Sequence, residues 1–493
     1  MQKHLIMALI AIILGSLLMI AYSTVEASLE IDAEKIDTFI SEEMSTSRVP
    51  GLALGIVENG EIVYLQGYGY VGRDRETTPQ TPFMIGSVSK SFTAVAAMQL
   101  HEEGKLNLDA PVKEYLPWFE MDGNFDVSEM TVHHLLVQTS GIPMTAGYTQ
   151  IAESSTLTLG KEVRALKEVA LVHSPGDAYI YSNANFIILS LIIEEVTETG
   201  YTGHVQDEIF NPLGMDNSFL NREDGEENGL SDGHIKWFGI PRATDVQYLE
   251  NSLAAGFIIA SAEDMSRYIL MHLGEGSYQG ATLLSQDGVA ELHRPGQVRQ
   301  GTTEYAMGLV AREQDDQTLI MHDGMIQGFN SGMVFSPEKQ WGVIVLTNMS
   351  SQLEMPAMNI ALGVADILQD KTPGSNARTW SMVYLGGLFL FLILIIMNLR
   401  SLILLPSRWL IRIKDNYPRG FIPILGRLVL PVGLELIFPY LVFIMIPSGA
   451  GFPVWNLFAL FHPDLVYMLL LLAALLLIKA LLRIYLLFRI RSN

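Results

Sequence analysis

The sequence predicts an α+β fold, in which one antiparallel sheet flanked by helices carries a helical lobe, and three transmembrane helices follow this domain. Two observations predict the domain: β-rich runs occur near both of its ends, and the stretch from about 110 to 290 has patterns typical of helices and long loops. Strands at both ends with helices between them indicate a single sheet. Three long apolar blocks near the C-terminus predict the membrane part.

The strands are predicted one by one from alternation and turn chemistry. Residues 52–58 and 61–70 flank Asn59-Gly60, which is the strongest short hairpin signal. A turn at 337–340, which contains Pro337, joins the last two strands. The strands predicted near the end of the domain are Tyr305–Ala311, Thr318–His322, Asn330–Phe335 and Trp341–Leu346.

One helix of the domain is predicted with particular clarity. Phe92, Val95 and Met98 recur at helical spacing, and the pattern runs from about Ser87 to Glu103. Gly104 ends it, as glycine commonly ends helices. Ser87 is therefore expected at the start of a helix.

The membrane part is predicted from length and charge. Each apolar block is near the ~20 residues that a bilayer-spanning helix needs. Lys and Arg gather between the first and second blocks and at the end of the third, whereas the loop from Pro447 to Asp464 has none, so the positive-inside rule places 28–378 outside the cell. Arg427 and Glu435 inside the second block indicate either a transport path or polar contacts of the helix. The blocks are Trp380–Asn398, Phe421–Ile446 and Leu465–Phe488.

The N-terminus has the pattern of an export signal. Lys3 precedes an apolar run from Leu5 to Tyr22, and small residues precede a cleavage site expected after Ala27. An uncleaved anchor is the alternative, because the run is nearly long enough to span a bilayer. The expected divisions are 1–27 for the signal or anchor, 28–370 for the globular domain, 371–379 for a linker and 380–493 for the membrane domain.

Composition excludes several classes of function. The formal net charge is −22, and the acidic excess lies in residues 28–378, so nucleic acid is not an expected partner. That acidity indicates either solubility in a salty or alkaline medium or attraction of cationic substrates. The chain has no cysteine, which excludes disulfides, thiolate metal sites and cysteine catalysis and suits an exported protein.

The first candidate catalytic group is Ser87 with Lys90, in an S-x-x-K pattern at the helix start. Residues three apart on a helix share a face, so the lysine amine can reach the serine hydroxyl. Burial lowers the pKa of a lysine, and a neutral lysine can take the proton from serine. A second match, Ser336 to Lys339, falls in a predicted turn, where the two side chains need not converge.

Two further groups accompany this pair along the chain. Tyr181-Ser182-Asn183 offers a phenol for proton relay and a carboxamide that can bind a substrate amide. His322-Asp323-Gly324 ends a predicted strand, whereas the similar His272-Leu273-Gly274 is expected to be only a helix stop. His133-His134 has apolar flanks that favour a packed helix over a metal site, and no metal or other cofactor is expected.

Together the three groups resemble the motifs of the serine β-lactamase/DD-peptidase superfamily, in its branch near class C β-lactamases and penicillin-binding proteins. They occur in the family's order, S-x-x-K, Tyr-x-Asn and Lys/His-x-Gly, and the resemblance covers most of residues 35–370. The stretches that carry it are 83–94 around Ser87, Gly104–Asp109, Thr139-Ser140-Gly141, Tyr181-Ser182-Asn183 and Trp341–Asn348.

The resemblance implies roles for seven residues and an acyl-enzyme mechanism. Ser87 would be the nucleophile, and Lys90 with Tyr181 would move its proton. Four residues are implied to bind substrate. Asn183 would orient Lys90 and a substrate amide, and His322 would line the opposite wall. Gly324 would let the strand approach the substrate, and the N–H of Met325 would join that of Ser87 in the oxyanion hole.

The resemblance also implies a substrate class. Many β-lactamases have Lys-Thr-Gly where this chain has His-Asp-Gly, and the acid at Asp323 weakens anion binding, so efficient β-lactam hydrolysis is not expected. We expect a multi-pass protein of the cell membrane whose extracellular catalytic domain acts on D-alanyl peptides, amides or esters of the cell wall, with β-lactams as further candidate ligands. The alternatives are a non-catalytic sensor of β-lactams or wall fragments that signals through its helices and, less favoured, a transporter with an accessory domain.

Overall fold

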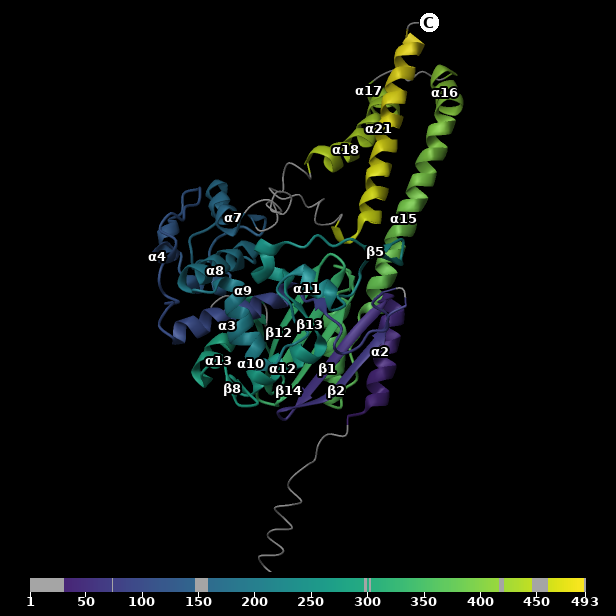
Figure 1. Ribbon diagram of the computed structural model, residues 1–493. Coiled ribbons are helices and arrows are strands. Elements are labelled where there is room, and N and C mark those ends of the chain that lie inside the picture. Colours follow the sequence, from purple (N-terminus) through teal and green to yellow (C-terminus); the bar gives the residue numbers. More distant parts are fainter. Residues whose placement is uncertain are drawn as a thin grey trace, which may run out of the picture.

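The computed structural model describes residues 31–72, 74–146, 158–296, 299–300, 303–415, 421–445 and 460–491. The predicted signal or anchor at 1–27 lies outside these residues. Figure 1 shows a globular α+β domain from which long C-terminal helices project to one side.

The globular domain is built on one antiparallel sheet, with strand order β2-β1-β14-β13-β12-β11-β10-β9. The N-terminal hairpin therefore pairs with the last long strand, as predicted from strands at both ends, and Leu52 lies opposite Thr347. The strands are β1 (Gly51–Glu58), β2 (Glu61–Gly69), β9 (Arg299–Gln300), β10 (Thr303–Tyr305), β11 (Val310–Gln314), β12 (Gln317–Ile326), β13 (Phe329–Ser336) and β14 (Trp341–Thr347).

Most predicted strands and turns are confirmed, with one clear error. Asn59 and Gly60 both have positive φ, as a two-residue hairpin turn requires. The prediction of one strand over Tyr305–Ala311 is wrong, because the chain turns at 306–309 and forms β10 and β11 in its place. Gly308 has φ +65 and no space for a Cβ, which only glycine tolerates.

Helices cover both faces of the sheet. On one face, α2 (Ala33–Ser47) and α14 (Pro356–Leu368) pack against β1, β13 and β14 through an apolar cluster that includes Ile40 and Ile360. On the other face lie α12 (Ala262–Leu273) and the helical lobe. The other helices of the lobe are α3 (Ser89–Glu102), α4 (Val112–Tyr115), α5 (Val132–Leu136), α7 (Leu159–Ala165), α8 (Asn183–Val196), α9 (Gly200–Val205), α10 (Asn211–Leu213), α11 (Arg222–Glu227) and α13 (Gln286–His293).

The prediction of only helices and loops over 110–290 missed short strands. Most of them have only two residues, too few for an alternation that would be evident in the sequence, but β4 and β5 have five residues each and form a local hairpin. Strands β4 and β5 form a hairpin that β15 joins in parallel, which gives a second sheet beside the main one. The missed strands within this stretch are β4 (Gly233–Trp237), β5 (Ile240–Thr244), β6 (Ile259–Ala260), β7 (Ser277–Tyr278) and β8 (Ala281–Thr282). Two short strands outside it, β3 (Phe83–Met84) and β15 (Met349–Ser350), pair with β6 and β4.

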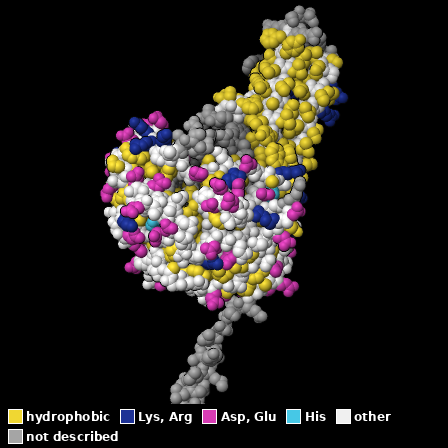
Figure 2. Space-filling view, viewed as in Figure 1, with side chains coloured by type: hydrophobic (Ala, Val, Ile, Leu, Met, Phe, Trp, Pro, Cys, Tyr) yellow, Lys and Arg dark blue, Asp and Glu magenta, His cyan; other side chains and the backbone are white. Residues whose placement is uncertain are grey.

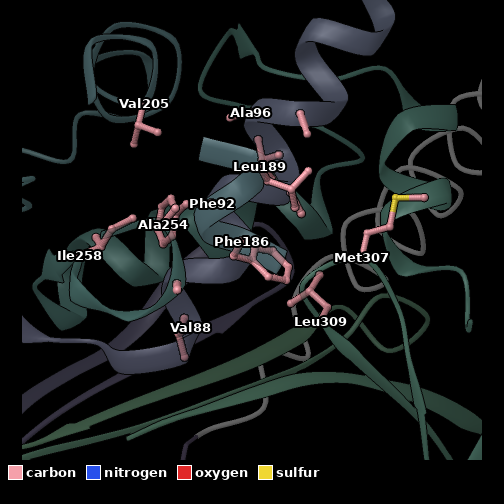
Figure 3. Packing of buried hydrophobic residues seen from close by; sticks show 14 of the residues in the cluster. Val88, Phe92, Ala96, Phe186, Leu189, Val205, Ala254, Ile258, Met307 and Leu309 are labelled. Carbon is pink, nitrogen blue, oxygen red and sulfur yellow. The ribbon is translucent and has the colours of Figure 1, made fainter. Parts of the chain in front are cut away.

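Helix α3 runs through the centre of the lobe. All its residues from Ser89 to Leu100 are buried, so this stretch has no solvent-exposed face. In Figure 3, Phe92 and Ala96 of α3 lie among side chains of α8, including Phe186 and Leu189. This packing fixes the helix whose start carries Ser87.

The C-terminal part contains two helices long and apolar enough to cross a membrane, Ala377–Trp409 and Pro463–Phe488. Figure 2 shows hydrophobic side chains covering the projecting helices, whereas Asp and Glu gather on the globular domain. The elements are α15 (Ala377–Leu404), η8 (Leu405–Trp409), α16 (Leu410–Asp415), α17 (Phe421–Ile424), η9 (Leu425–Val429), α18 (Leu430–Tyr440), η10 (Leu441–Met445) and α21 (Pro463–Arg491).

Three transmembrane helices were expected, but only the first and third apolar blocks form helices of spanning length in the described part of the chain. The second predicted block, Phe421–Ile446, is divided into short helical segments, and its apolar helix covers only Leu430–Ile444. Prolines at Pro431 and Pro439 interrupt regular helical hydrogen bonding there. Glu435 of this block contacts Lys479 and Arg483 of α21, which is the polar contact that the sequence allowed as one alternative.

Candidate active site

Ser87 lies where a short 3₁₀ turn, η1 (Gly86–Val88), leads into α3. The preceding residue, Gly86, has φ +56, and a Cβ there would lie 2.5 Å from the backbone nitrogen of Met325. Gly324 is equally confined, since its Cβ would lie 2.0 Å from the carbonyl oxygen of Ile85. Two glycines thus let β12 pack directly against the segment that presents Ser87.

The structure gives Gly324 a role besides the predicted approach of the strand to substrate. Its close neighbour is the backbone just before Ser87. Ser331 strengthens the same contact, because its hydroxyl donates a 2.6 Å hydrogen bond to the Ile85 carbonyl. Met325, one residue further along β12, lines the same cavity as Ser87.

Lys90 is fully buried one helical turn from Ser87. Its Nζ lies 3.2 Å from Ser87 Oγ, 2.7 Å from Asn183 Oδ1 and 2.5 Å from the carbonyl oxygen of Ala255. Burial lowers the pKa of Lys90 to about 7, against the opposing effect of the Asp323 charge. Near neutral pH, a large fraction of Lys90 is therefore the neutral amine.

The three neighbours of Lys90 Nζ define what the neutral amine can do. An NH₂ group has two N–H donors and one lone pair. The oxygens of Asn183 and Ala255 can only accept, so they take the two donors. The lone pair is then left for the third neighbour, Ser87 Oγ, whose proton it can accept.

Tyr181 is a further neighbour of the lysine. Its ring centroid is 4.9 Å from Lys90 Nζ, and its ring also faces those of Tyr305 and His322. The structure thus brings the S-x-x-K and Tyr-x-Asn residues together from segments more than 90 positions apart.

The Tyr-x-Asn segment is held by a residue that the sequence did not single out. Gln138 is fully buried, and its Oε1 accepts hydrogen bonds from Ser182 N at 2.8 Å and from Asn185 Nδ2 at 2.5 Å. Ser140 Oγ donates to Asn185 Oδ1 at 2.6 Å. Gln138 has φ +62, an uncommon conformation for a residue with a side chain and one that clusters at functional sites.

His322 is buried behind the site, outside the described lining of the Ser87 cavity. Its Nδ1 lies 2.6 Å from the Asp323 carbonyl, which can only accept, so Nδ1 carries a proton. Burial lowers the pKa of His322 and favours the neutral ring, while the Asp323 charge opposes this effect and the Lys90 charge adds to it. His322 contacts Tyr181 and Tyr305 and therefore helps to position Tyr181.

The cavity beside Ser87 has a volume of about 160 Å³. Three of the site residues predicted from the sequence line this cavity, namely Ser87, Asn183 and Met325. The others, Lys90, Tyr181, His322 and Gly324, are not part of its described lining. The sequence did not predict the segment from Val246 to Phe257, whose Ala255 also holds Lys90. A backbone carbonyl leaves no signature in a sequence, so this contact could not have been read from residue types.

The other sequence candidates lie apart from this site. Lys339 bonds to Asp316 at the surface, so the second S-x-x-K match is a turn. Gly274 follows α12, which confirms the His-Leu-Gly helix stop. His134 caps α5 by accepting from Thr131 N, and no cluster of His, Asp and Glu among the described residues could hold a metal ion.

An antiparallel sheet with a helical lobe, and a serine one turn from a buried lysine, define the class of serine β-lactamases and penicillin-binding proteins. A family model described as Beta-lactamase matches residues 36–365. The chain belongs to this family.

Two curated relatives are similar over most of the same domain. "Protein flp" of Staphylococcus aureus (strain MW2) is 28% identical over 323 residues, which are 65% of this chain and 64% of that protein. "Putative penicillin-binding protein PbpX" of Bacillus subtilis (strain 168) is 29% identical over 62% of this chain and 72% of its own length. The match therefore spans less than two thirds of the S. aureus protein.

A solved structure supports the same fold. The octameric penicillin-binding protein homologue from Pyrococcus abyssi is 28% identical, with a TM-score of 0.62, over 70% of this chain and 78% of its own.

Proposed function

We propose that this protein is a membrane-anchored serine hydrolase that acts through an acyl-enzyme on D-alanyl peptides, amides or esters of the cell wall. The observation that carries the proposal is Lys90, a buried amine with a pKa of about 7 whose Nζ lies 3.2 Å from Ser87 Oγ. Burial of a lysine costs free energy, because it shifts the amine toward the neutral form. Groups whose pKa is shifted in this way cluster at catalytic sites.

The reaction follows from this geometry. Neutral Lys90 takes the proton of Ser87 Oγ as the oxygen bonds to the substrate carbonyl carbon. The backbone N–H groups of Ser87 and Met325 stabilise the resulting oxyanion. The bond to the leaving group then breaks, and the proton passes from Lys90, with Tyr181, to that group. Water attacks the acyl-enzyme and releases the acid and free Ser87.

The proposed topology places this chemistry beside the wall. Residues 28–370 lie outside the cell, a linker covers 371–379, and 380–493 form the membrane domain. The basic loop before Phe421 and the basic C-terminus lie in the cytoplasm, which requires the second apolar block to cross the bilayer despite its prolines. A cell-wall polymer, its peptides and β-lactams are then the candidate ligands, and the bilayer is a partner.

The test is covalent labelling of the full-length protein in detergent. A fluorophosphonate and a fluorescent penicillin are incubated with wild type and Ser87→Ala, and the adduct is located by mass spectrometry of the peptide that contains Ser87. Labelling of wild type alone supports the proposal, and D-alanyl esters and peptides are then assayed as substrates.

The contrary outcome is equally clear. If neither probe labels the folded wild-type protein, Ser87 is not an activated nucleophile. The non-catalytic sensor would then account better for a binding domain attached to membrane helices.

A further inference from the structure

The cavity beside Ser87 is completed by residues of the C-terminal membrane part. Leu460 and Phe461 line it together with Ser87, Asn183 and Met325, although they lie more than 100 residues beyond the end of the sheet. Phe461 is only 4% exposed. The position of this ring therefore depends on the start of α21 at Pro463, one of the two candidate membrane spans.

The chain just after Phe461 is fixed to the globular domain by buried polar contacts. Asp464 Oδ2 accepts a 2.7 Å hydrogen bond from the backbone N–H of Phe238, at the tip of the β4–β5 hairpin. Tyr384 of α15 donates its hydroxyl to the same Asp464 oxygen and accepts from Gly239 N at 3.1 Å. Residues of both candidate membrane spans, α15 and α21, thus contact the tip of the β4–β5 hairpin.

The same hairpin leads into another part of the cavity lining. Strand β5 ends at Thr244, and Val246, two residues later, lines the cavity with Leu249 and Phe257. The cavity wall therefore joins apolar side chains of the globular domain to those of Leu460 and Phe461. A wall of this kind favours an apolar group over a charged one.

We propose that Phe461, with Leu460, forms one side of the acyl-binding pocket and selects substrates whose acyl group carries a short apolar chain. The inference rests on the proposed function and assigns the membrane part a role in specificity besides anchoring. The cavity of about 160 Å³ is similar to the roughly 150 Å³ that holds a benzene molecule, so it has room for a D-alanyl methyl or a short apolar chain.

The test compares p-nitrophenyl acetate with p-nitrophenyl butyrate on the full-length protein in detergent, each rate being divided by that of uncatalysed hydrolysis. A buried methylene favours binding about fourfold, so two of them give wild type a butyrate preference in kcat/KM of about 15-fold. Phe461→Ala is expected to reduce this preference to about fourfold or less. Phe461→Leu is expected to retain most of it.

The matched control is Phe389→Ala, which removes an exposed aromatic ring of α15 that does not line the cavity. Its butyrate preference should equal that of wild type. Fluorophosphonate labelling of Ser87 and a thermal unfolding curve establish that each variant is folded, and Phe461→Leu keeps the test decisive if the alanine variant misfolds.

Two failures can be told apart. If wild type hydrolyses neither ester and Ser87 is not labelled, the proposed function fails. If hydrolysis depends on Ser87 but the butyrate preference is the same in wild type, Phe461→Ala and Phe461→Leu, the function stands and the acyl pocket does not include Phe461.

Discussion

The rate at which a fluorophosphonate labels Ser87 should depend on the protonation of Lys90. Burial lowers the pKa of this lysine to about 7, and only the neutral amine can take the serine proton. Labelling should therefore increase as pH rises, with a midpoint near 7, and reach a plateau above it. The second-order labelling constant of the full-length protein is measured at half-unit steps from pH 5 to pH 10.

The size of the change distinguishes a buried lysine from an ordinary one. With a midpoint near 7, the neutral fraction increases about tenfold between pH 6 and pH 8 and little thereafter. A lysine with its usual pKa would instead give about a 100-fold increase over that interval and a continued rise to pH 10. The two curves differ most above pH 8.

Replacing Asp323 tests the cause of the midpoint. Its negative charge favours the protonated lysine, so Asp323→Asn should lower the pKa of Lys90 further. A midpoint about one pH unit lower would raise labelling at pH 6 about fivefold and leave the plateau unchanged. Asp316→Asn is the control, because it removes one acid that is paired with Lys339 at the surface.

Two results would refute this reasoning. A labelling rate that still climbs tenfold per unit between pH 8 and pH 10 means that Lys90 is charged at neutral pH and is not the base. An identical midpoint in wild type, Asp323→Asn and Asp316→Asn means that the charge at Asp323 does not act on the group that titrates.

Three further substitutions test the supports of the site and the membrane part. Gly324→Ala should destabilise the protein by about 1–3 kcal/mol and slow Ser87 labelling, because its Cβ has no space. Gly160→Ala is the control, since position 160 in α7 has free space, and should change stability by about 1 kcal/mol or less. Both stabilities are measured by thermal unfolding. Lys236→Met should cost about 3–5 kcal/mol in denaturant unfolding, because it leaves the buried Glu354 without its ion-pair partner. Glu435→Gln removes the counter-ion of two basic residues of α21 and should lower the melting temperature in detergent by several degrees. An unchanged melting temperature would mean that these ion pairs do not hold the helices together.

The sequence predicts those parts of the fold that are coded locally. The turn at Asn59-Gly60 requires positive φ at two neighbouring positions, and few residue pairs allow this. The central helix follows from apolar spacing and from its stop at Gly104. Strand β15 is only two residues long and pairs with β4 more than 100 positions away, so local pattern does not reveal it. Strands β4 and β5 pair with each other as a local hairpin, which the prediction of helices and loops missed.

The candidate site likewise contains some groups that the sequence predicts and others that it does not. Ser87, Lys90 and Asn183 could be predicted because their side-chain chemistry is characteristic and their spacing fits a helix start and a loop. The Ala255 carbonyl and the Phe461 ring could not, since one is a backbone atom and the other is an ordinary apolar residue. Only the folded chain brings them to the cavity.

The contact between Gly86 and β12 gives the His322-Asp323-Gly324 motif a structural role that does not depend on substrate binding. A side chain at Gly324 would collide with the Ile85 carbonyl, and one at Gly86 would collide with Met325 N, so each glycine is required by the backbone of the other segment. The strand and the turn therefore fix each other. Because the N–H groups of Ser87 and Met325 must converge on one oxyanion, the precision of this backbone contact sets the geometry on which the proposed chemistry depends.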